Sequence, residues 1–125
     1  METIYLLIIM VLGQWFGDFV VQDDELAAGK HKDFTKLLLH CLQYSLVFLI
    51  FGIICAIFGL FNVSIIGAFL FFGLTFGEHI LVDHVMSSIG YVELENGNQN
   101  TFLGYMLMDQ GIHYLCLIMT YLLLF

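Results

Sequence analysis

GAFLFFGLTFGEHILVDH, Gly67 to His84, combines two kinds of residue that rarely share one helix. The first ten residues are apolar enough to lie in lipid. The last seven include four ionisable side chains, Glu78, His79, Asp83 and His84, with no lysine or arginine beside them. A charged side chain near the middle of a bilayer costs about 2.5–3.5 kcal/mol on insertion scales, so such a group indicates a functional site or a compensating partner.

The composition of the whole chain agrees with a membrane setting for this stretch. Of the 125 residues 61% are hydrophobic and only 11% are charged, whereas a soluble domain has about 25% charged residues. The sequence therefore predicts one integral membrane domain over residues 1–125. A net charge of −8, with three lysines and no arginine, argues against nucleic acid as a partner.

Four apolar runs have the length of about 17–25 residues that a spanning helix requires. They cover about residues 4–21, 37–60, 65–85 and 102–125. The chain has no proline, so nothing forces a kink in any of them. The predicted fold is all-α, a four-helix membrane bundle built from two tandem helical hairpins, with both termini on the same side.

A repeated motif suggests that the two hairpins arose by duplication. Gly13–Asp18 and Gly73–Glu78 both read GxxFG followed by an acid. The alternative is chance similarity between two segments drawn from mostly apolar residues.

The lysines decide the expected orientation in the membrane. Lys30, Lys32 and Lys36 are all the lysines of the chain, and all lie in the connection 22–36. The positive-inside rule then places this connection, and the connection 86–101 with it, in the cytoplasm, with both termini outside. We expect the lysines to set topology and anchor to lipid headgroups; binding of a substrate phosphate is the alternative.

The ionisable residues of the spans all fall in the half nearest those two connections. His79 and Asp83 lie four residues apart and share a helix face, as do Asp109 and His113. His40 lies at the same level of the second span, and Asp18 near the end of the first. The sequence therefore predicts one polar layer across the bundle.

A bound cation would compensate the acids of this layer. Histidine with carboxylate suits Zn²⁺ first, with Mn²⁺ and Fe²⁺ as alternatives. The predicted metal ligands are His40, His79, Asp83, Asp109 and His113. The predicted general bases are Glu78 and Asp18, and the predicted supporting residues are Gln14, Gln22, Tyr44 and Gln110. The alternative is that the polar pairs only hold helices together by hydrogen bonds.

Four motifs in order resemble a known family: FGDFVVQ (Phe16–Gln22), LLLH (Leu37–His40), HILVD (His79–Asp83) and LMDQGIH (Leu107–His113). They are similar to a small bacterial and phage membrane family, domain of unknown function 3307. The resemblance covers nearly the whole chain and implies a four-helix protein of the bacterial inner membrane, without an established activity. The family usually has histidine where this chain has Gln14, which lowers the ligand count or leaves the first helix in a supporting role.

Three functions fit these observations. The first is metal-dependent hydrolysis of a lipid phosphate or ester reached from the cytoplasmic leaflet; a distant resemblance to membrane-bound metal-dependent hydrolases points the same way. The second is a small proton or metal-ion transporter or channel, for which four helices leave little room unless the protein forms a homo-oligomer. The third is a structural or holin-like bundle in which the polar layer fixes helix register.

Overall fold

The computed structural model describes residues 2–21, 25 and 29–125, and this part of the chain is helical with short turns. The elements are α1 (Glu2–Trp15), the π-helix η1 (Phe16–Val20), α3 (Phe34–Phe58), α4 (Ile65–Glu95) and α5 (Gln99–Leu124). The prediction of an all-α fold with four long apolar helices is confirmed.

Each of the four helical segments is long and apolar enough to cross a bilayer. The segments are Thr3–Val20, Phe34–Phe58, Ile65–Glu95 and Gln99–Leu124. Between 17% and 28% of each apolar window is buried inside the protein. Most of the apolar surface therefore faces outward, where lipid would cover it. The chain is a multi-pass membrane protein.

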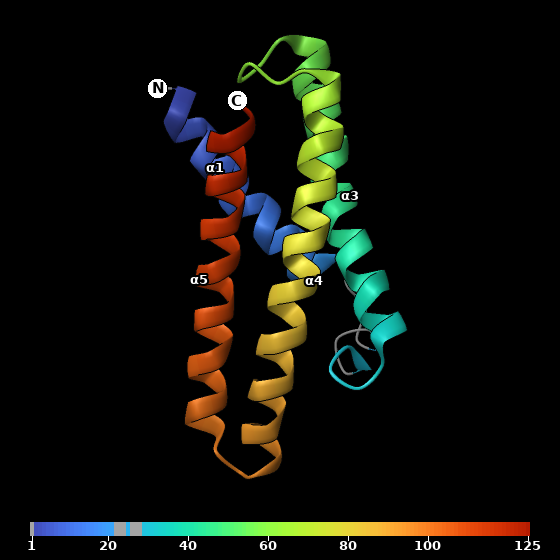
Figure 1. The fold of residues 1–125 in the computed structure, drawn as a ribbon. Coiled ribbons are helices and arrows are strands. Elements are labelled where there is room, and N and C mark those ends of the chain that lie inside the picture. Colours follow the sequence, from blue (N-terminus) through green and yellow to red (C-terminus); the bar gives the residue numbers. More distant parts are fainter. Residues whose placement is uncertain (1, 22–24, 26–28) are drawn as a thin grey trace.

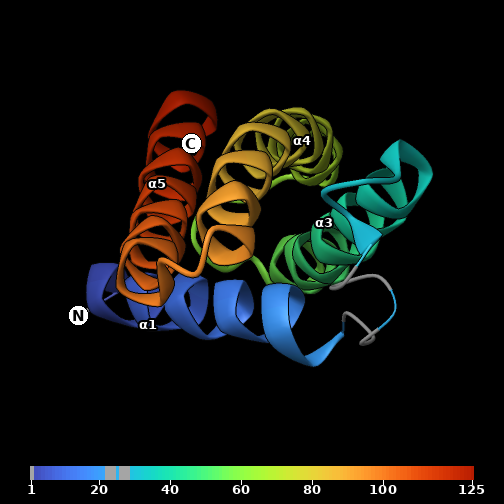
Figure 2. The same cartoon turned by 90° about the horizontal axis from the view of Figure 1, so that it is seen from below.

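Helix α4 lies at the centre of the arrangement and packs along both α3 and α5. Figure 1 shows these three helices running along the length of the bundle, with α1 passing behind them at a steep angle. Figure 2, the view from below, shows α1 lying across the others. In Figure 1 the start of α1 and the end of α5 lie at the same end. We call this the terminal half, and the opposite end, which holds the turn between α4 and α5, the loop half.

Specific residues begin and end these helices. The side chain of Asp33 accepts a hydrogen bond from Thr35 N at the start of α3, and that of Ser64 accepts one from Gly67 N at the start of α4. Helix α3 ends at Gly59, whose φ of 64° lies in the left-handed region that favours glycine. The residues between the second and third predicted runs, 61–64, lie in the turn between α3 and α4.

The third helix is longer than the apolar run predicted. We expected a polar connection from residue 86, but α4 continues to Glu95 and the turn starts at Asn96. Met86 and Gly90 in this extension are buried, so the extension still packs inside the protein. Gly97, with φ 81°, makes the turn. Leaving the hydrocarbon region does not end a helix; a turn residue does.

The first span widens into a π-helix although the chain lacks proline. Val21 N donates to Phe16 O at 3.0 Å, a bond over five residues. Gly17 allows the close approach: a Cβ at this position would lie 2.8 Å from Tyr44 Cδ2. The matching glycine of the repeated motif, Gly77, has no such neighbour within 4 Å. The two motifs thus serve different contacts, and the π-helix carries Asp18 into the bundle.

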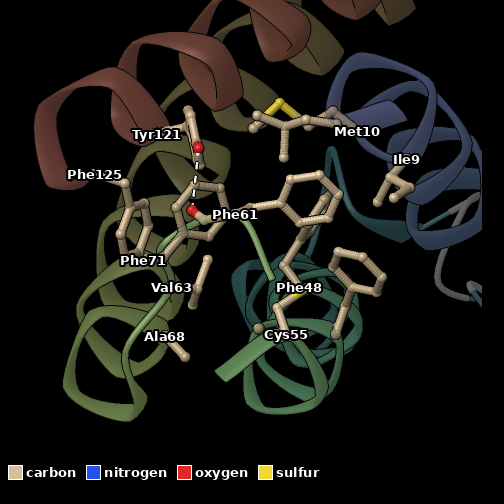
Figure 3. Close-up of a pocket in the computed structure, with 13 residues that line it drawn as sticks. Ile9, Met10, Phe48, Cys55, Phe61, Val63, Ala68, Phe71, Tyr121 and Phe125 are labelled. Atoms are coloured by element: carbon tan, nitrogen blue, oxygen red, sulfur yellow. Dashed lines mark hydrogen bonds between the residues drawn. The ribbon is translucent and has the colours of Figure 1, made fainter. Parts of the chain in front are cut away.

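The terminal half is packed with apolar side chains. Leu6, Met10, Phe48, Phe71 and Leu117 belong to its buried core. Figure 3 shows Met10, Phe48 and Phe71 around a small apolar cavity of about 40 Å³, with Tyr121 donating a hydrogen bond to Phe61 O at 3.2 Å. The residues that line this cavity include no histidine, aspartate, glutamate or lysine.

Candidate metal centre

The structure brings the predicted layer together from every helical segment. Asp18 comes from η1, His40 from α3, His79 and Asp83 from α4, and Asp109 and His113 from α5. Asp109 is 15% exposed, and each of the others is at most 3% exposed. The i,i+4 pairs on α4 and α5 point into the same space, as the spacing predicted.

One group of four residues, which we call the first cluster, consists of Asp18, His40, His79 and Asp83. His40 Nε2 lies 3.0 Å from His79 Nε2, 3.0 Å from Asp18 Oδ1 and 3.3 Å from Asp83 Oδ2. His79 Nε2 lies 3.6 Å from Asp18 Oδ1 and 3.9 Å from Asp83 Oδ2. Ligands at 2.0–2.2 Å from a tetrahedral Zn²⁺ lie about 3.3–3.6 Å from one another, so the four atoms have nearly the required spacing.

Hydrogen bonds alone do not account for the first cluster. Two Nε2–H groups cannot face each other at 3.0 Å, so the Nε2 of at least one of His40 and His79 is unprotonated and cannot donate to the neighbouring carboxylates. Asp18 Oδ1 is buried without a hydrogen-bond partner among the described residues. A cation stabilises lone pairs that converge in a buried site. Histidine and carboxylate ligands fit a divalent transition metal.

A second cluster adjoins the first and consists of Asp18, Asp109 and His113. His113 Nε2 lies 3.3 Å from Asp109 Oδ1 and 3.4 Å from Asp83 Oδ1. Asp83 therefore faces both clusters, with Oδ2 toward His40 and Oδ1 toward His113.

Lys30 enters this site from the connection before α3. Its Nζ lies 2.9 Å from Asp83 Oδ2, and its side chain is only 14% exposed. Burial by itself would lower the pKa of Lys30, but the negative charges of Asp83 and Asp18 outweigh that effect and raise it. Lys30 thus stays charged and compensates one of the buried carboxylates, a role we did not predict for it.

The other two lysines have exposed acids as partners. Lys32 Nζ lies 3.4 Å from Glu95, with both side chains more than 60% exposed. Lys36 Nζ lies 2.9 Å from Glu25, whose side chain is 82% exposed. These contacts agree with lysines at a membrane surface, and the headgroup and topology roles predicted for them stay predictions.

Amides and a tyrosine hold Asp18 in place. Gln110 Nε2 donates to Asp18 Oδ2 at 2.5 Å, and Gln14 Nε2 donates to the same oxygen at 3.4 Å and to Gln110 Oε1 at 3.2 Å. Tyr44 OH donates to Gln14 Oε1, and its ring stacks on His79 with centroids 3.8 Å apart. Three predicted supporting residues therefore contact the site or its neighbours; the fourth, Gln22, lies outside the described residues.

Glu78 belongs to neither cluster and contacts Thr120 instead. Thr120 Oγ1 donates to its two carboxylate oxygens, at 3.0 and 2.8 Å. With Thr120 on α5, this contact ties α4 to α5 beside a small cavity that Glu78 lines together with His79 and His113. The catalytic role predicted for Glu78 stays a prediction; Asp18, which belongs to both clusters, is the better placed of the two predicted bases.

A cavity of about 160 Å³ opens onto the centre from the loop half. Its polar wall is formed by Asp18, Lys30, Asp83, Asp109 and Gln110. Its other wall is mainly apolar and includes Phe19, Met86, Tyr91, Phe102, Tyr105 and Met106. At about 30 Å³ for each water in the liquid, the cavity has room for about five waters or for part of a small amphiphile.

The family comparison covers almost the whole of this arrangement. A family model described as Protein of unknown function (DUF3307) matches residues 6–125. The chain belongs to this family. No curated protein and no solved structure matches it. Membership in DUF3307 confirms the resemblance carried by the four motifs, while the resemblance to membrane-bound hydrolases stays a prediction.

Two contacts in and beside this site were not predicted from the sequence, that of Lys30 with Asp83 and that of Thr120 with Glu78. Lys30 lies in a connection, where no helical period gives the direction of a side chain. Thr120 looks like an ordinary small polar residue in an apolar run. One feature of the sequence could have indicated that Lys30 lies near the site. Its connection joins the segment that carries Asp18 to the helix that carries His40.

Proposed function

We propose that this protein is a membrane-embedded hydrolase that depends on a divalent metal and cleaves an ester or phosphoester of a membrane-associated substrate. The observation that carries the proposal is the first cluster, in which His40, His79 and Asp83 bring two imidazole nitrogens and a carboxylate oxygen together beside a cavity, with Asp18 next to them. Zn²⁺ is the metal that this donor set favours, with Mn²⁺ and Fe²⁺ as alternatives.

His40, His79 and Asp83 would hold the metal. Three protein ligands with one position left for water or substrate are typical of catalytic zinc sites. A bound divalent cation would lower the pKa of water in that position toward about 7. Asp18 Oδ1, at 3.0 Å from His40 Nε2 and without a hydrogen-bond partner of its own, is positioned to accept the proton.

The remaining polar groups would bind and orient the substrate. Lys30 is on the cavity wall, so its ammonium can approach an anionic substrate group once a metal has taken over the charge of Asp83. Gln110 and Gln14 keep the Asp18 carboxylate in one orientation through their amide groups. The apolar wall, with Phe102 and Tyr105, would take the uncharged part of an amphiphile.

The cavity opens in the loop half, so a substrate would enter it from the leaflet on that side of the membrane. We propose that the connection 22–36 and the turn after α4 face the cytoplasm of a bacterial cell and that the termini lie outside, since all three lysines belong to that connection. The substrate is then a lipid phosphate or ester of the cytoplasmic leaflet.

The test is hydrolysis of phospholipids, lipid phosphates and lipid esters by detergent-purified, Zn²⁺-supplemented protein. We expect activity toward at least one class, loss of that activity in His79→Asn, and at least half of it in Glu78→Gln. Activity that is equal in wild type and His79→Asn, or a protein that binds the metal but cleaves none of the three classes, would overturn the hydrolase proposal.

A further inference from the structure

One metal in the first cluster leaves Asp109 and His113, in the second cluster, without a role. Asp109 Oδ1 is buried and has no hydrogen-bond partner among the described residues. His113 Nε2 can carry one proton, yet it lies almost equally far from Asp109 Oδ1, at 3.3 Å, and from Asp83 Oδ1, at 3.4 Å. The ligand atoms of Asp18, Asp109 and His113 all lie within 4.8 Å of one another, close enough to share one cation.

Asp83 has the orientation of a bridging ligand. Its Oδ2 lies 3.3 Å from His40 Nε2, while its Oδ1 faces His113 in the second cluster. Asp18 belongs to both clusters and is fixed by two glutamine amides. Carboxylates shared between neighbouring donor sets suit two-metal sites, in which the metals lie about 3.5–4 Å apart.

We propose that the second cluster, Asp18, Asp109 and His113, binds a second divalent cation, with the Asp83 carboxylate lying between the two clusters. This inference rests on the proposed function, because it adds a metal to that same centre. Two metals can stabilise both the attacking and the leaving oxygen of a displacement at phosphorus. The substrate class is therefore a phosphate ester rather than a carboxylic ester.

The ammonium of Lys30 is the competing second cation. Three carboxylates, Asp18, Asp83 and Asp109, carry three negative charges, which one divalent metal and Lys30 would neutralise. However, Lys30 contacts Asp83 through Oδ2, the oxygen that faces the first cluster, and Asp109 Oδ1 stays without a hydrogen-bond partner. A second metal would satisfy Asp109 and His113 and would displace Lys30 toward the cavity that it already lines.

The experiment is titration of detergent-purified, metal-stripped protein with Mn²⁺, with metal counted by elemental mass spectrometry and examined by electron paramagnetic resonance. Two variants remove second-cluster ligands, Asp109→Asn and His113→Gln. The matched control is Glu78→Gln, which also turns a partly buried acid into its amide but alters a group that contacts Thr120. Gel filtration and thermal unfolding show that each variant is folded.

We expect two Mn²⁺ per chain in wild type and in Glu78→Gln, with the halved hyperfine splitting of a coupled metal pair. Asp109→Asn and His113→Gln should each hold one Mn²⁺ with a mononuclear spectrum. One Mn²⁺ per chain in wild type would overturn the second site. A second Mn²⁺ that then appears in Lys30→Met would identify the ammonium as the second cation. No Mn²⁺ and no Zn²⁺ bound at all would instead overturn the proposed function itself.

Discussion

Replacing Lys30 by methionine removes the lysine ammonium that contacts the centre. The Nζ of Lys30 lies 2.9 Å from Asp83 Oδ2, and the Asp83 side chain is 1% exposed. Methionine keeps much of the length and apolar character of the lysine stem but leaves the carboxylate uncompensated. The metal-free protein should therefore lose stability, and a bound metal should restore part of it.

The size of the loss follows from the geometry. At 2.9 Å the Coulomb attraction of two unit charges is about 6 kcal/mol at an effective dielectric constant of about 20, and breaking a buried pair by removing one partner costs about 3–5 kcal/mol. With about 2.1 cal/mol/K of unfolding entropy per residue, a chain of 125 residues loses roughly 4 °C of Tm per kcal/mol. The expected loss is then about 10–20 °C. Lys32→Met, which breaks an exposed pair with Glu95, should cost at most about 1 kcal/mol.

The assay is thermal unfolding in detergent with a chelator and then with Zn²⁺. The deficit of Lys30→Met relative to wild type should shrink by more than half with Zn²⁺, because the metal supplies the missing positive charge. The pKa of Lys30 is raised above 10.5, so the contribution of the ammonium is fully present below the unfolded pKa and is lost only as pH rises through the folded pKa. The deficit should therefore be equal at pH 7 and pH 9. Equal losses in Lys30→Met and Lys32→Met, or a deficit that Zn²⁺ does not change, would refute this reasoning.

Two further substitutions test other contacts of the site. Gly17→Ala adds a Cβ 2.8 Å from the Tyr44 ring, and this overpacking should lower stability by about 1–3 kcal/mol in thermal unfolding. The control Gly77→Ala, with no neighbour within 4 Å, should lower stability by less than half as much. Equal losses of stability in the two variants would contradict the reasoning. Thr120→Val removes the hydroxyl that donates to Glu78 and should cost about 1–3 kcal/mol while the metal content stays unchanged; loss of metal in this variant would show that the contact supports the centre directly.

Much of the fold was predictable because lipid imposes simple requirements. A span in hydrocarbon must be long, apolar and internally hydrogen-bonded, and the runs near residues 37–60 and 102–125 met these requirements. The end of α4 was not predictable in the same way. Residues 86–95 are more polar, yet they continue the helix to Glu95, because the turn depends on Asn96 and Gly97 rather than on the loss of hydrophobicity.

The candidate site was predictable where a helix fixes the direction of a side chain. His79 with Asp83, and Asp109 with His113, lie one turn apart, and the level of each pair within its span predicted that they would meet. The position of Lys30 depends on the path of a connection and on the charge of the carboxylates it meets, which the linear sequence does not specify. The π-helix at Phe16–Val20 depends on the packing of Gly17 against Tyr44, so it could not be predicted from the sequence either.

The central claim, a metal bound by the buried histidines and aspartates, is tested most directly by the metal content of protein purified without chelators. Elemental mass spectrometry would compare wild type with His79→Asn and with His84→Asn, a control on the same helix whose side chain is exposed. We predict at least one equivalent of a transition metal in wild type and in His84→Asn, and a loss of at least one equivalent in folded His79→Asn. A wild-type protein that contains no metal and takes up none on titration with Zn²⁺, Mn²⁺ or Fe²⁺ would contradict the account.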